Sequence, residues 1–466
     1  MQTGYNNISE KQNTISIVNI WLALFVMSSL IAFIVQLVVL PYIFPSWNGG
    51  HGLLVGMDSL SFHQIALELA NKTSNHGWSN WEFRPSGQSV AGIMGAVYVL
   101  TGIQEPWIVI PIYTMLYATG GILLWLIIDF FLKDRQKSLL CLIPYIFLPS
   151  AIMLYAQPHK DMWQIVGFFC FIYGWCLFLR PTTWKNLSLA LKALLIILAG
   201  AFFSWIVRPY CVQIMQVIAT LLATILAPVL VYLILKKRIK LFKTCIVILL
   251  IWMSVIILTP FTTPQLISFY FIYFKYSSSQ SDHLGYSITP SESITTPISP
   301  NPNWNKTYWL PIFIDQKLAD IAMARDGFCR TEGNSNLDKE ITCNSAHDIF
   351  LYLPRAMEIG FLSPFPYQWF EIGSTSYNTL FRRIAGLEMI ITYVGELLLI
   401  WGITKFWRKS EIWAISISSI IMIMAYAFAI INVGTLYRER WGYIILLSSL
   451  GFAMFLKYRN QKTMLK

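Results

Sequence analysis

The hydrophobic residues of this chain fall in long runs, separated by short segments rich in Lys and Arg. A helix needs about 20 apolar residues to cross a bilayer, and ten runs approach that length. The first is too long for a cleavable signal peptide and lacks a basic start and a small-residue cleavage site. We therefore expect ten transmembrane helices, at residues 17–42, 106–132, 138–156, 162–179, 187–207, 211–235, 244–262, 385–404, 412–432 and 441–456.

The charges between these runs predict the orientation, because Lys and Arg concentrate in cytoplasmic loops. With the N-terminus inside, the inner segments hold 18 Lys or Arg and three acids, a net charge of +15. The outer segments hold 15 Lys or Arg and 17 acids, a net charge of −2. We expect both termini inside. The outer segments are then 43–105, 157–161, 208–210, 263–384 and 433–440.

The composition agrees with a fold embedded in lipid, since 56% of the 466 residues are hydrophobic and 12% are charged. A soluble enzyme carries about 25% charged residues. The net charge of +11 follows from the topology and does not indicate nucleic acid as a partner. We expect an all-α integral membrane protein with amphipathic outer helices. Its parts are an N-terminal transmembrane module at 1–262, a large external loop at 263–384 and C-terminal transmembrane helices at 385–466.

The first outer loop, at 43–105, contains a candidate for acid–base chemistry. Apolar residues recur at helical spacing between 62 and 69, which predicts an amphipathic helix at the membrane interface. Asp58 stands where this helix begins. It is either an N-cap, a position that favours Asp, or a general base that takes the proton of a sugar hydroxyl. His63 follows on the same helix as a candidate substrate contact.

Two short outer segments add candidate phosphate contacts. His159, Lys160 and Asp161 lie in a loop of about five residues, so their charges are close to the membrane plane. They either face solvent or meet a donor phosphate, which Lys binds as a point charge. Arg208 and Tyr210 form a bend between two spans and are either interfacial anchors or contacts to phosphate or sugar.

Two arginines next to the last span, Arg438 and Arg440, lie outside against the positive-inside rule. A forked guanidinium binds phosphate or diphosphate through two parallel hydrogen bonds. Glu439 stands between them and is alternatively their structural partner. This segment therefore predicts either a phosphate site or a local ion pair.

The large loop and the eighth span hold the remaining candidates. Arg355 joins the substrate contacts, in a segment expected to form short helices. Cys329 and Cys343 predict a disulfide if the exterior is oxidising, which would close a loop of about 15 residues. Glu388 and Glu396 fall within a span, where ionisable groups suggest a proton relay or hydrogen bonds inside the bundle. No His or Cys spacing predicts a zinc site.

The order of these motifs resembles the GT-C membrane glycosyltransferases, which use sugars linked to polyprenyl phosphate. More narrowly, it resembles GT-C-type proteins of bacterial polysaccharide clusters. The resemblance spans most of the chain. The motifs that carry it lie at 58–100, 160–161, 208–210, 353–356, 364–366 and 432–440.

This resemblance implies that Asp58 is the base, or an acid facing a metal, and that outer basic residues hold the donor phosphate. Many GT-C enzymes carry two neighbouring acids here, whereas Ser59 follows Asp58 in this chain. We therefore expect a single base and no required cofactor, with a divalent cation in doubt. The implied place is a bacterial inner membrane with the site on the periplasmic face.

The resemblance also implies the partners, which are a polyprenyl-linked sugar donor, a glycan or lipid-linked acceptor, and membrane lipids. Within the same class, an O-antigen-type polymerase or ligase is the alternative. Outside it, a transporter or flippase of lipid-linked sugar would use Glu388 and Glu396 and would need no outer base.

Overall fold

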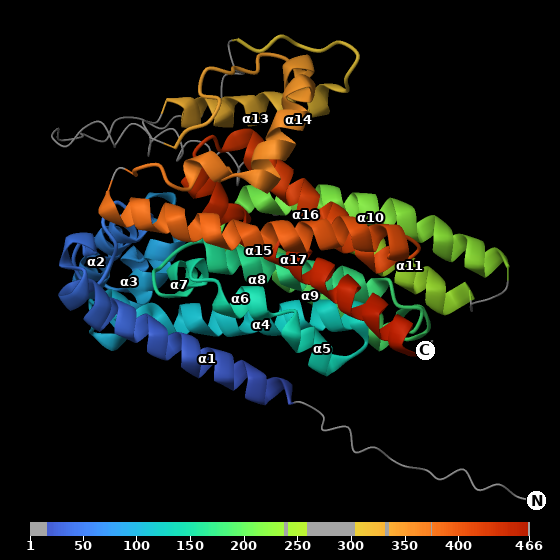
Figure 1. Ribbon diagram of the computed structural model, residues 1–466, viewed down its shortest axis with the longest axis horizontal. Coiled ribbons are helices and arrows are strands. Elements are labelled where there is room, and N and C mark those ends of the chain that lie inside the picture. Colours follow the sequence, from blue (N-terminus) through green and yellow to red (C-terminus); the bar gives the residue numbers. More distant parts are fainter. Residues whose placement is uncertain (1–15, 237–240, 259–302, 331–334, 374, 465–466) are drawn as a thin grey trace, which may run out of the picture.

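The computed structural model describes residues 16–236, 241–258, 303–330, 335–373 and 375–464 (Figure 1). Within these residues the chain is helical, and its only β contacts are three isolated bridges. Eight helical segments in the described part are long and apolar enough to cross a membrane. The expectation of an all-α membrane protein is therefore confirmed.

The eight long segments coincide with eight of the ten predicted spans. The first span continues from α1 into a π-helix, η1, and the second begins with a 3₁₀ turn, η5. They are α1 (Ile17–Ile34) with η1 (Val35–Ile43), η5 (Pro106–Val109) with α4 (Ile110–Leu132), α8 (Asp161–Phe178), α9 (Leu187–Val207), α10 (Pro209–Leu235), α15 (Ser376–Phe406), α16 (Ser410–Ala429) and α17 (Val433–Met464).

Two of these helices begin eight or nine residues earlier than predicted. α15 starts at Ser376 rather than at 385, with the Thr375 hydroxyl accepting a hydrogen bond from the Asn378 amide at 3.0 Å. α17 starts at Val433 rather than at 441, and the Asn432 side chain accepts from the Thr435 amide at 3.1 Å. The first turns of both helices are polar, so hydropathy does not detect them. The predicted outer loop at 433–440 is therefore helix.

The third predicted span, 138–156, is not one helix. It consists of α5 (Arg135–Leu140), α6 (Ile143–Phe147) and α7 (Ser150–Tyr155). Pro144 and Pro149 break it, because proline lacks the amide hydrogen and clashes with the preceding turn. The seventh predicted span, 244–262, corresponds to α11 (Leu241–Ile256), and its last residues lie outside the described part.

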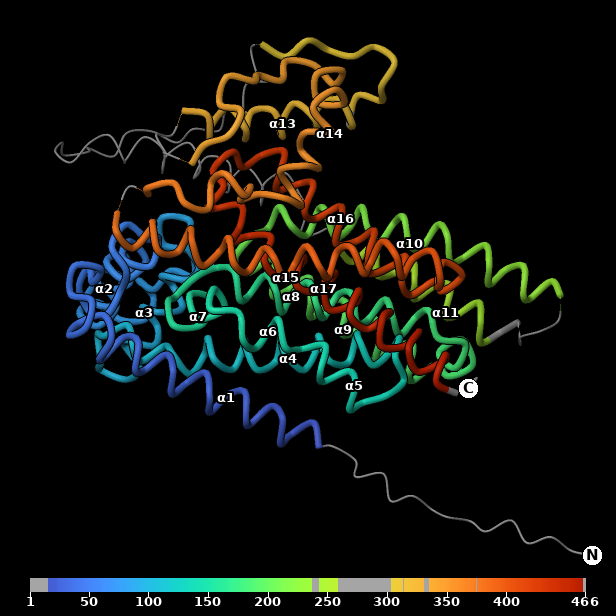
Figure 2. The backbone as a smooth tube through the Cα atoms, viewed as in Figure 1, coloured from blue at the N-terminus to red at the C-terminus, as the bar shows by residue number. Residues whose placement is uncertain are grey.

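The broken segment runs back along α4 (Figure 2). The Trp125 indole donates to the Arg135 carbonyl at 3.1 Å, near the C-terminal end of α4. Earlier in α4, Tyr117 donates to the Tyr145 carbonyl at 3.0 Å, and Tyr145 donates to the Tyr117 carbonyl at 2.8 Å. The three short helices therefore return toward the end of the bundle where α4 began.

Small residues bring the long helices close together. A Cβ on Gly167 of α8 would lie 2.8 Å from the Gly200 carbonyl oxygen of α9, closer than any real contact. Gly395 of α15 similarly faces Ser448 of α17. Such small-residue contacts let membrane helices approach until their backbones pack against each other.

The segment predicted as the first outer loop, 43–105, contains α2 (Asp58–His76) and α3 (Ser89–Thr101), which pack together at one end of the bundle, called the α2 end here (Figure 1). Phe62, Ala66 and Leu69 are buried, so the predicted amphipathic helix is confirmed. α13 (Ile312–Cys329) and α14 (Ala346–Leu362) project beside α16. Short 3₁₀ turns are η2 (Pro45–Trp47), η3 (Trp78–Asn80), η4 (Pro85–Gly87), η6 (Thr183–Lys185) and η8 (Pro366–Gln368).

Candidate functional site

Four segments that are far apart in the sequence meet at the α2 end. They are the start of α2, the loop that leads into α8, the bend between α9 and α10, and the first turns of α17. Their ionisable side chains interact with one another and are called the charged cluster here. Its members are Asp58, His159, Lys160, Asp161, Arg208, Arg438 and Glu439.

The inner part of the charged cluster is a buried ion triad. Arg208 donates to the Asp161 carboxylate at 2.7 Å, and its Nη2 lies 3.0 Å from Oε1 of Glu439. The side chains of Arg208 and Asp161 are only 3% and 2% exposed. Arg208 also donates to the Tyr426 hydroxyl at 3.4 Å. All of these contacts of the guanidinium are to protein groups, so Arg208 is a structural support of the site.

The outer part of the cluster is reached from solvent. Arg438 Nη2 lies 3.1 Å from Oδ2 of Asp58, and its Nε lies 3.1 Å from Oδ2 of Asp161. The Asp58 side chain is 59% exposed and that of Arg438 is 18% exposed. Arg438 thus connects an accessible carboxylate to the buried triad, and the two form the mouth of the cluster.

The N-cap interpretation of Asp58 is wrong in this structure. α2 begins at Asp58 itself, the preceding residue is Met57, and no side chain caps the helix. The carboxylate instead accepts a hydrogen bond from Arg438. The positive end of the α2 dipole adds a favourable field at this first-turn carboxylate.

The charged neighbours keep Asp58 ionised. The surrounding protein partly dehydrates the Asp58 carboxyl group and raises its pKa, but the nearby positive charges, that of Arg438 first, and the hydrogen bond from Arg438 lower the pKa by more. The pKa of this carboxyl group therefore lies below its ordinary value, and the group is a carboxylate at neutral pH. A carboxylate next to solvent is the form that accepts a proton.

The two remaining cluster members, His159 and Lys160, have pKa values that are lowered mainly by burial. Burial, aided by the charge of Arg438, lowers the pKa of His159 to about 4, so its imidazole is neutral at pH 7. Burial, aided by the charge of Arg208, lowers the pKa of Lys160 to about 8, so its ammonium is still charged at pH 7. The His159 ring is buried, and within the described residues its Nε2 has no hydrogen-bond partner.

Two glutamines that the sequence reading missed hold the loops of the cluster in place. Gln157 accepts from the Leu54 amide at 3.2 Å and donates to the Gly52 carbonyl at 3.1 Å. Gln36, inside the first span, donates to the Ala156 carbonyl at 2.6 Å. The sequence feature that could have pointed to these two glutamines is a polar residue next to or within an apolar run. The Gln157 bonds tie the loop before α8 to the loop before α2, and the Gln36 bond ties it to the first span.

The two arginines predicted next to the last span, Arg438 and Arg440, have different roles, and so does Glu439 between them. Glu439 pairs with Arg208 rather than with its neighbours, so it is a structural partner of a different arginine. Arg440 lies outside the charged cluster and is fully buried. Its guanidinium donates to backbone carbonyls at the end of α14, those of Ile359, Gly360 and Ser363. The expected phosphate contact of Arg440 is therefore replaced by a structural one.

Three more candidates contact other parts of the molecule. Arg355 pairs with Asp338 at 2.9 Å and with Glu358 at 2.8 Å in the external segment. Tyr210 packs edge-on against Tyr426, beside the buried triad. His63 hydrogen-bonds Tyr98 at 2.8 Å, on the side of α2 that faces α3. Burial, together with the neighbouring imidazole of His51, lowers the pKa of His63 to about 4.

The predicted disulfide is not formed in the structure, where Cys329 and Cys343 are both free thiols. Arg325 of α13 connects this region instead. Its guanidinium donates to the carbonyls of Ile341 at 3.2 Å and Asp338 at 2.9 Å. Hydrogen bonds from one buried arginine therefore attach residues 338–341 to α13 without a covalent link.

The two span glutamates differ in their surroundings. Glu388 is buried and accepts from the Ser150 amide at 2.7 Å, which caps the first turn of α7, and from the Tyr437 hydroxyl. It thereby attaches the broken third segment to α15 and α17. Glu396 lies two turns further along α15, and within the described residues its Oε1 has no hydrogen-bond partner.

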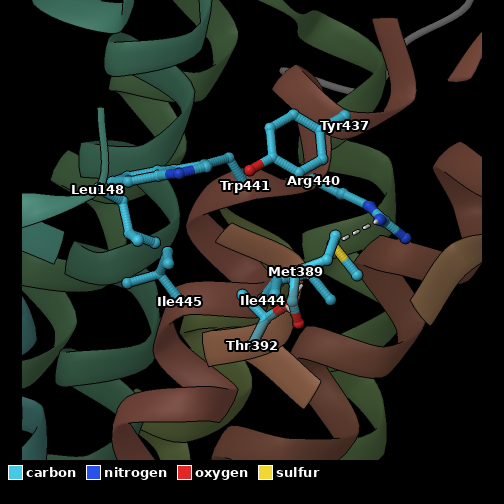
Figure 3. Close-up of a pocket in the computed structure, with 8 residues that line it drawn as sticks. All are labelled: Leu148, Met389, Thr392, Tyr437, Arg440, Trp441, Ile444 and Ile445. Carbon is cyan, nitrogen blue, oxygen red and sulfur yellow. Dashed lines mark hydrogen bonds between the residues drawn. The ribbon is translucent and has the colours of Figure 1, made fainter. Parts of the chain in front are cut away.

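A small internal cavity lies below Arg440 and Tyr437 (Figure 3). Its volume is about 10 Å³, which is room for roughly one water molecule. It therefore cannot hold a sugar. Its lining consists of Leu148, Met389, Thr392, Tyr437, Arg440, Trp441, Ile444 and Ile445.

Metal dependence stays a prediction. In the described part of the chain, no group of three His, Cys, Asp or Glu side chains is placed to hold a metal ion. Comparison with known proteins adds no identification, since no protein-family model and no curated protein matches the chain.

Proposed function

We propose that this protein is a membrane glycosyltransferase that moves a sugar from a polyprenyl-(di)phosphate donor to a glycan or lipid acceptor. The observation that carries the proposal is the pair at the mouth of the charged cluster. An accessible carboxylate, Asp58, lies 3.1 Å from a guanidinium, Arg438, at one end of a membrane-type helix bundle. This juxtaposition suits a reaction that needs a base beside a phosphate.

In the proposed step, the acceptor hydroxyl oxygen attacks the anomeric carbon of the donor sugar. The new carbon–oxygen bond forms as the bond to the polyprenyl phosphate breaks, and the phosphate leaves with the electron pair. Asp58 takes the hydroxyl proton, as a general base. Arg438 and Lys160 stabilise the negative charge that develops on the leaving phosphate.

The charges of the cluster support separate roles for its cations. Arg208 is buried between Asp161 and Glu439, whereas Arg438 is partly exposed, so we assign Arg208 to holding Asp161 in place. Asp161 in turn directs Arg438 toward the mouth. The neutral His159 is buried behind the mouth, so we assign it no contact with the donor phosphate. We therefore assign the binding of the donor phosphate to Arg438 and Lys160.

The proposal includes ten crossings with both termini in the cytoplasm. The eight long helices, the broken segment at 135–155 and α11 would make these crossings. The basic inner segments support this orientation. The charged cluster would then lie at the periplasmic face of a bacterial inner membrane, where lipid-linked rather than nucleotide-linked sugars are the available donors.

Label transfer by the purified protein in lipid vesicles tests this proposal. The donors are radiolabelled polyprenyl-phosphate and polyprenyl-diphosphate sugars, and the acceptors are cell-envelope glycans. We expect transfer from at least one donor. If no donor supports transfer while the vesicles move a lipid-linked sugar across the bilayer, the protein is a transporter and the proposal is wrong.

The pH dependence of transfer tests the role of Lys160. Its pKa of about 8 means that the ammonium loses its charge as the pH rises through 8. We expect the KM for the donor to rise over that range, because one phosphate contact is lost. In Lys160→Arg the charge persists at these pH values, so the KM should stay level. The same alkaline rise in both proteins would exclude Lys160 as its cause.

A further inference from the structure

The C-terminal turn of α14 inserts between three long helices. A Cβ on Gly360 would lie 3.1 Å from side-chain atoms of both Ile423 and Ala427 of α16. The Tyr393 hydroxyl of α15 donates to the Leu362 carbonyl at 2.6 Å. Arg440 of α17 donates to the Ile359 carbonyl at 2.9 Å. Figures 1 and 2 show α14 running down onto the bundle from the side that carries α13.

The positions of these contacts give the depth of the turn. Charged residues at 405–411 mark the end of the bundle opposite to α2. Tyr393 lies thirteen residues before the last residue of α15, and Ile423 lies thirteen residues after the first residue of α16. At 1.5 Å per residue both are about 20 Å from that opposite end. For helices that run along the membrane normal from a boundary at 405–411, and for a hydrocarbon core about 30 Å thick, the end of α14 would lie roughly 10 Å inside the core.

The hydrogen bonds of this turn agree with a position in hydrocarbon. The last carbonyls of a helix have no partner within the helix, and leaving them unpaired in lipid costs several kcal/mol each. Here Arg440 and Tyr393 together donate to the carbonyls of Ile359, Gly360, Leu362 and Ser363. This need for hydrogen-bond donors explains why an arginine, Arg440, is buried beside the end of α14.

The side of α14 that faces away from the bundle carries an apolar stripe. Its residues recur at the three- and four-residue spacing of one helix face. Phe350, Leu353 and Met357 are between 39% and 49% exposed. The charged pair Arg355 and Glu358 lies on the other edge of the exposed surface. The stripe consists of Phe350, Leu353, Pro354 and Met357, and it ends at Phe361, which is partly buried against the core.

The stripe continues into a surface that faces lipid. Its deep end adjoins the Leu362–Tyr393 contact, and Tyr393 stands beside exposed apolar residues of α15, among them Ile390, Val394 and Leu397. At its other end, Trp309 stacks on Phe350 at 6.2 Å. Aromatic residues above an apolar helix face are typical of a segment that lies in the membrane interface.

We propose that α14 is a partly inserted helix, whose apolar stripe contacts the acyl chains of the leaflet at the α2 end. Depth, continuity with α15 and the paired carbonyls all favour lipid as the occupant of the stripe. The charged edge with Arg355 and Glu358 then faces water. At the α2 end of the molecule, α14 thereby separates the lipid from the water that reaches the charged cluster.

Photo-crosslinking in phosphatidylethanolamine–phosphatidylglycerol vesicles tests this proposal. We would replace Phe350 or Met357, in separate full-length proteins, by p-benzoylphenylalanine, irradiate, and identify adducts by mass spectrometry. Leu397 of α15 is the matched lipid-facing control, and Glu340 is the exposed control in the external segment. We expect lipid adducts at 350 and 357 in yields close to that at 397 and several-fold above that at 340.

Two results would overturn the proposal. One is a yield of lipid adduct at 350 and 357 as low as that at 340, while 397 still crosslinks to lipid. The other is a crosslink between two copies of the chain at 350 and 357 in place of lipid adducts, because the stripe would then be a dimer contact. Both tested positions are exposed, so the bulky side chain does not require repacking of the core.

Discussion

Asp58→Asn is expected to lower the rate of sugar transfer by about 10²- to 10⁴-fold, the usual contribution of a general base. Asparagine keeps the size of the side chain and its place at the start of α2, but it cannot take the acceptor proton. The KM for the donor should change little, because Arg438 and Lys160 remain. The measurement is label transfer in vesicles with saturating donor.

The matched control is Glu68→Gln, which removes an exposed carboxylate from the same helix. It should leave transfer unchanged. Thermal unfolding of Asp58→Asn should also resemble that of the wild type, since the Asp58–Arg438 pair is partly exposed and such pairs stabilise by at most about 1 kcal/mol. If Asp58→Asn transfers sugar as fast as the wild type, Asp58 is not the base.

Arg208→Met is expected to destabilise the fold by about 3–5 kcal/mol, the cost of removing one partner of a buried ion pair. Asp161 and Glu439 would then be two buried carboxylates without the guanidinium that now lies 2.7 Å and 3.0 Å from them. The measurement is the free energy of unfolding of the purified protein in detergent.

The control for this change is Lys72→Met, which breaks an exposed pair with Glu82 and should cost less than about 1 kcal/mol. Adding Asp161→Asn and Glu439→Gln to Arg208→Met should restore much of the stability, because no buried charge is then left unpaired. Equal stability of Arg208→Met and the wild type would show that the triad is not a structural support.

Most of the helix bundle was predictable from hydropathy, because lipid requires long apolar helices with internally paired backbones. The third span was predicted as one helix, although Pro144 and Pro149 divide it. The starts of α15 and α17 were missed, because their first turns are polar yet capped by Thr375 and Asn432. Hydropathy detects apolar runs, and the polar first turns of a helix carry no such signal, whether they are exposed or packed against other helices.

The candidate residues of the charged cluster were also predictable, since charges at the ends of spans stand out against apolar runs. Their roles were not. Arg438 and Arg440 are two residues apart, yet one reaches Asp58 and the other reaches the carbonyls of α14. On a helix, residues at this spacing point in different directions, and the packed partners differ accordingly.

Local sequence pattern is enough to establish a helical chain with membrane-type spans, and to locate the charges at the ends of those spans. Both follow from local pattern, because lipid selects apolar runs and excludes charge. Which of these charges meet depends on how the helices pack in three dimensions. Asp58 and Arg438 are 380 residues apart, and packing of α2, α8, α10 and α17 brings them within hydrogen-bond distance. The same packing buries Arg208 between two carboxylates and leaves Asp58 open to solvent, because burial depends on neighbours from the whole bundle.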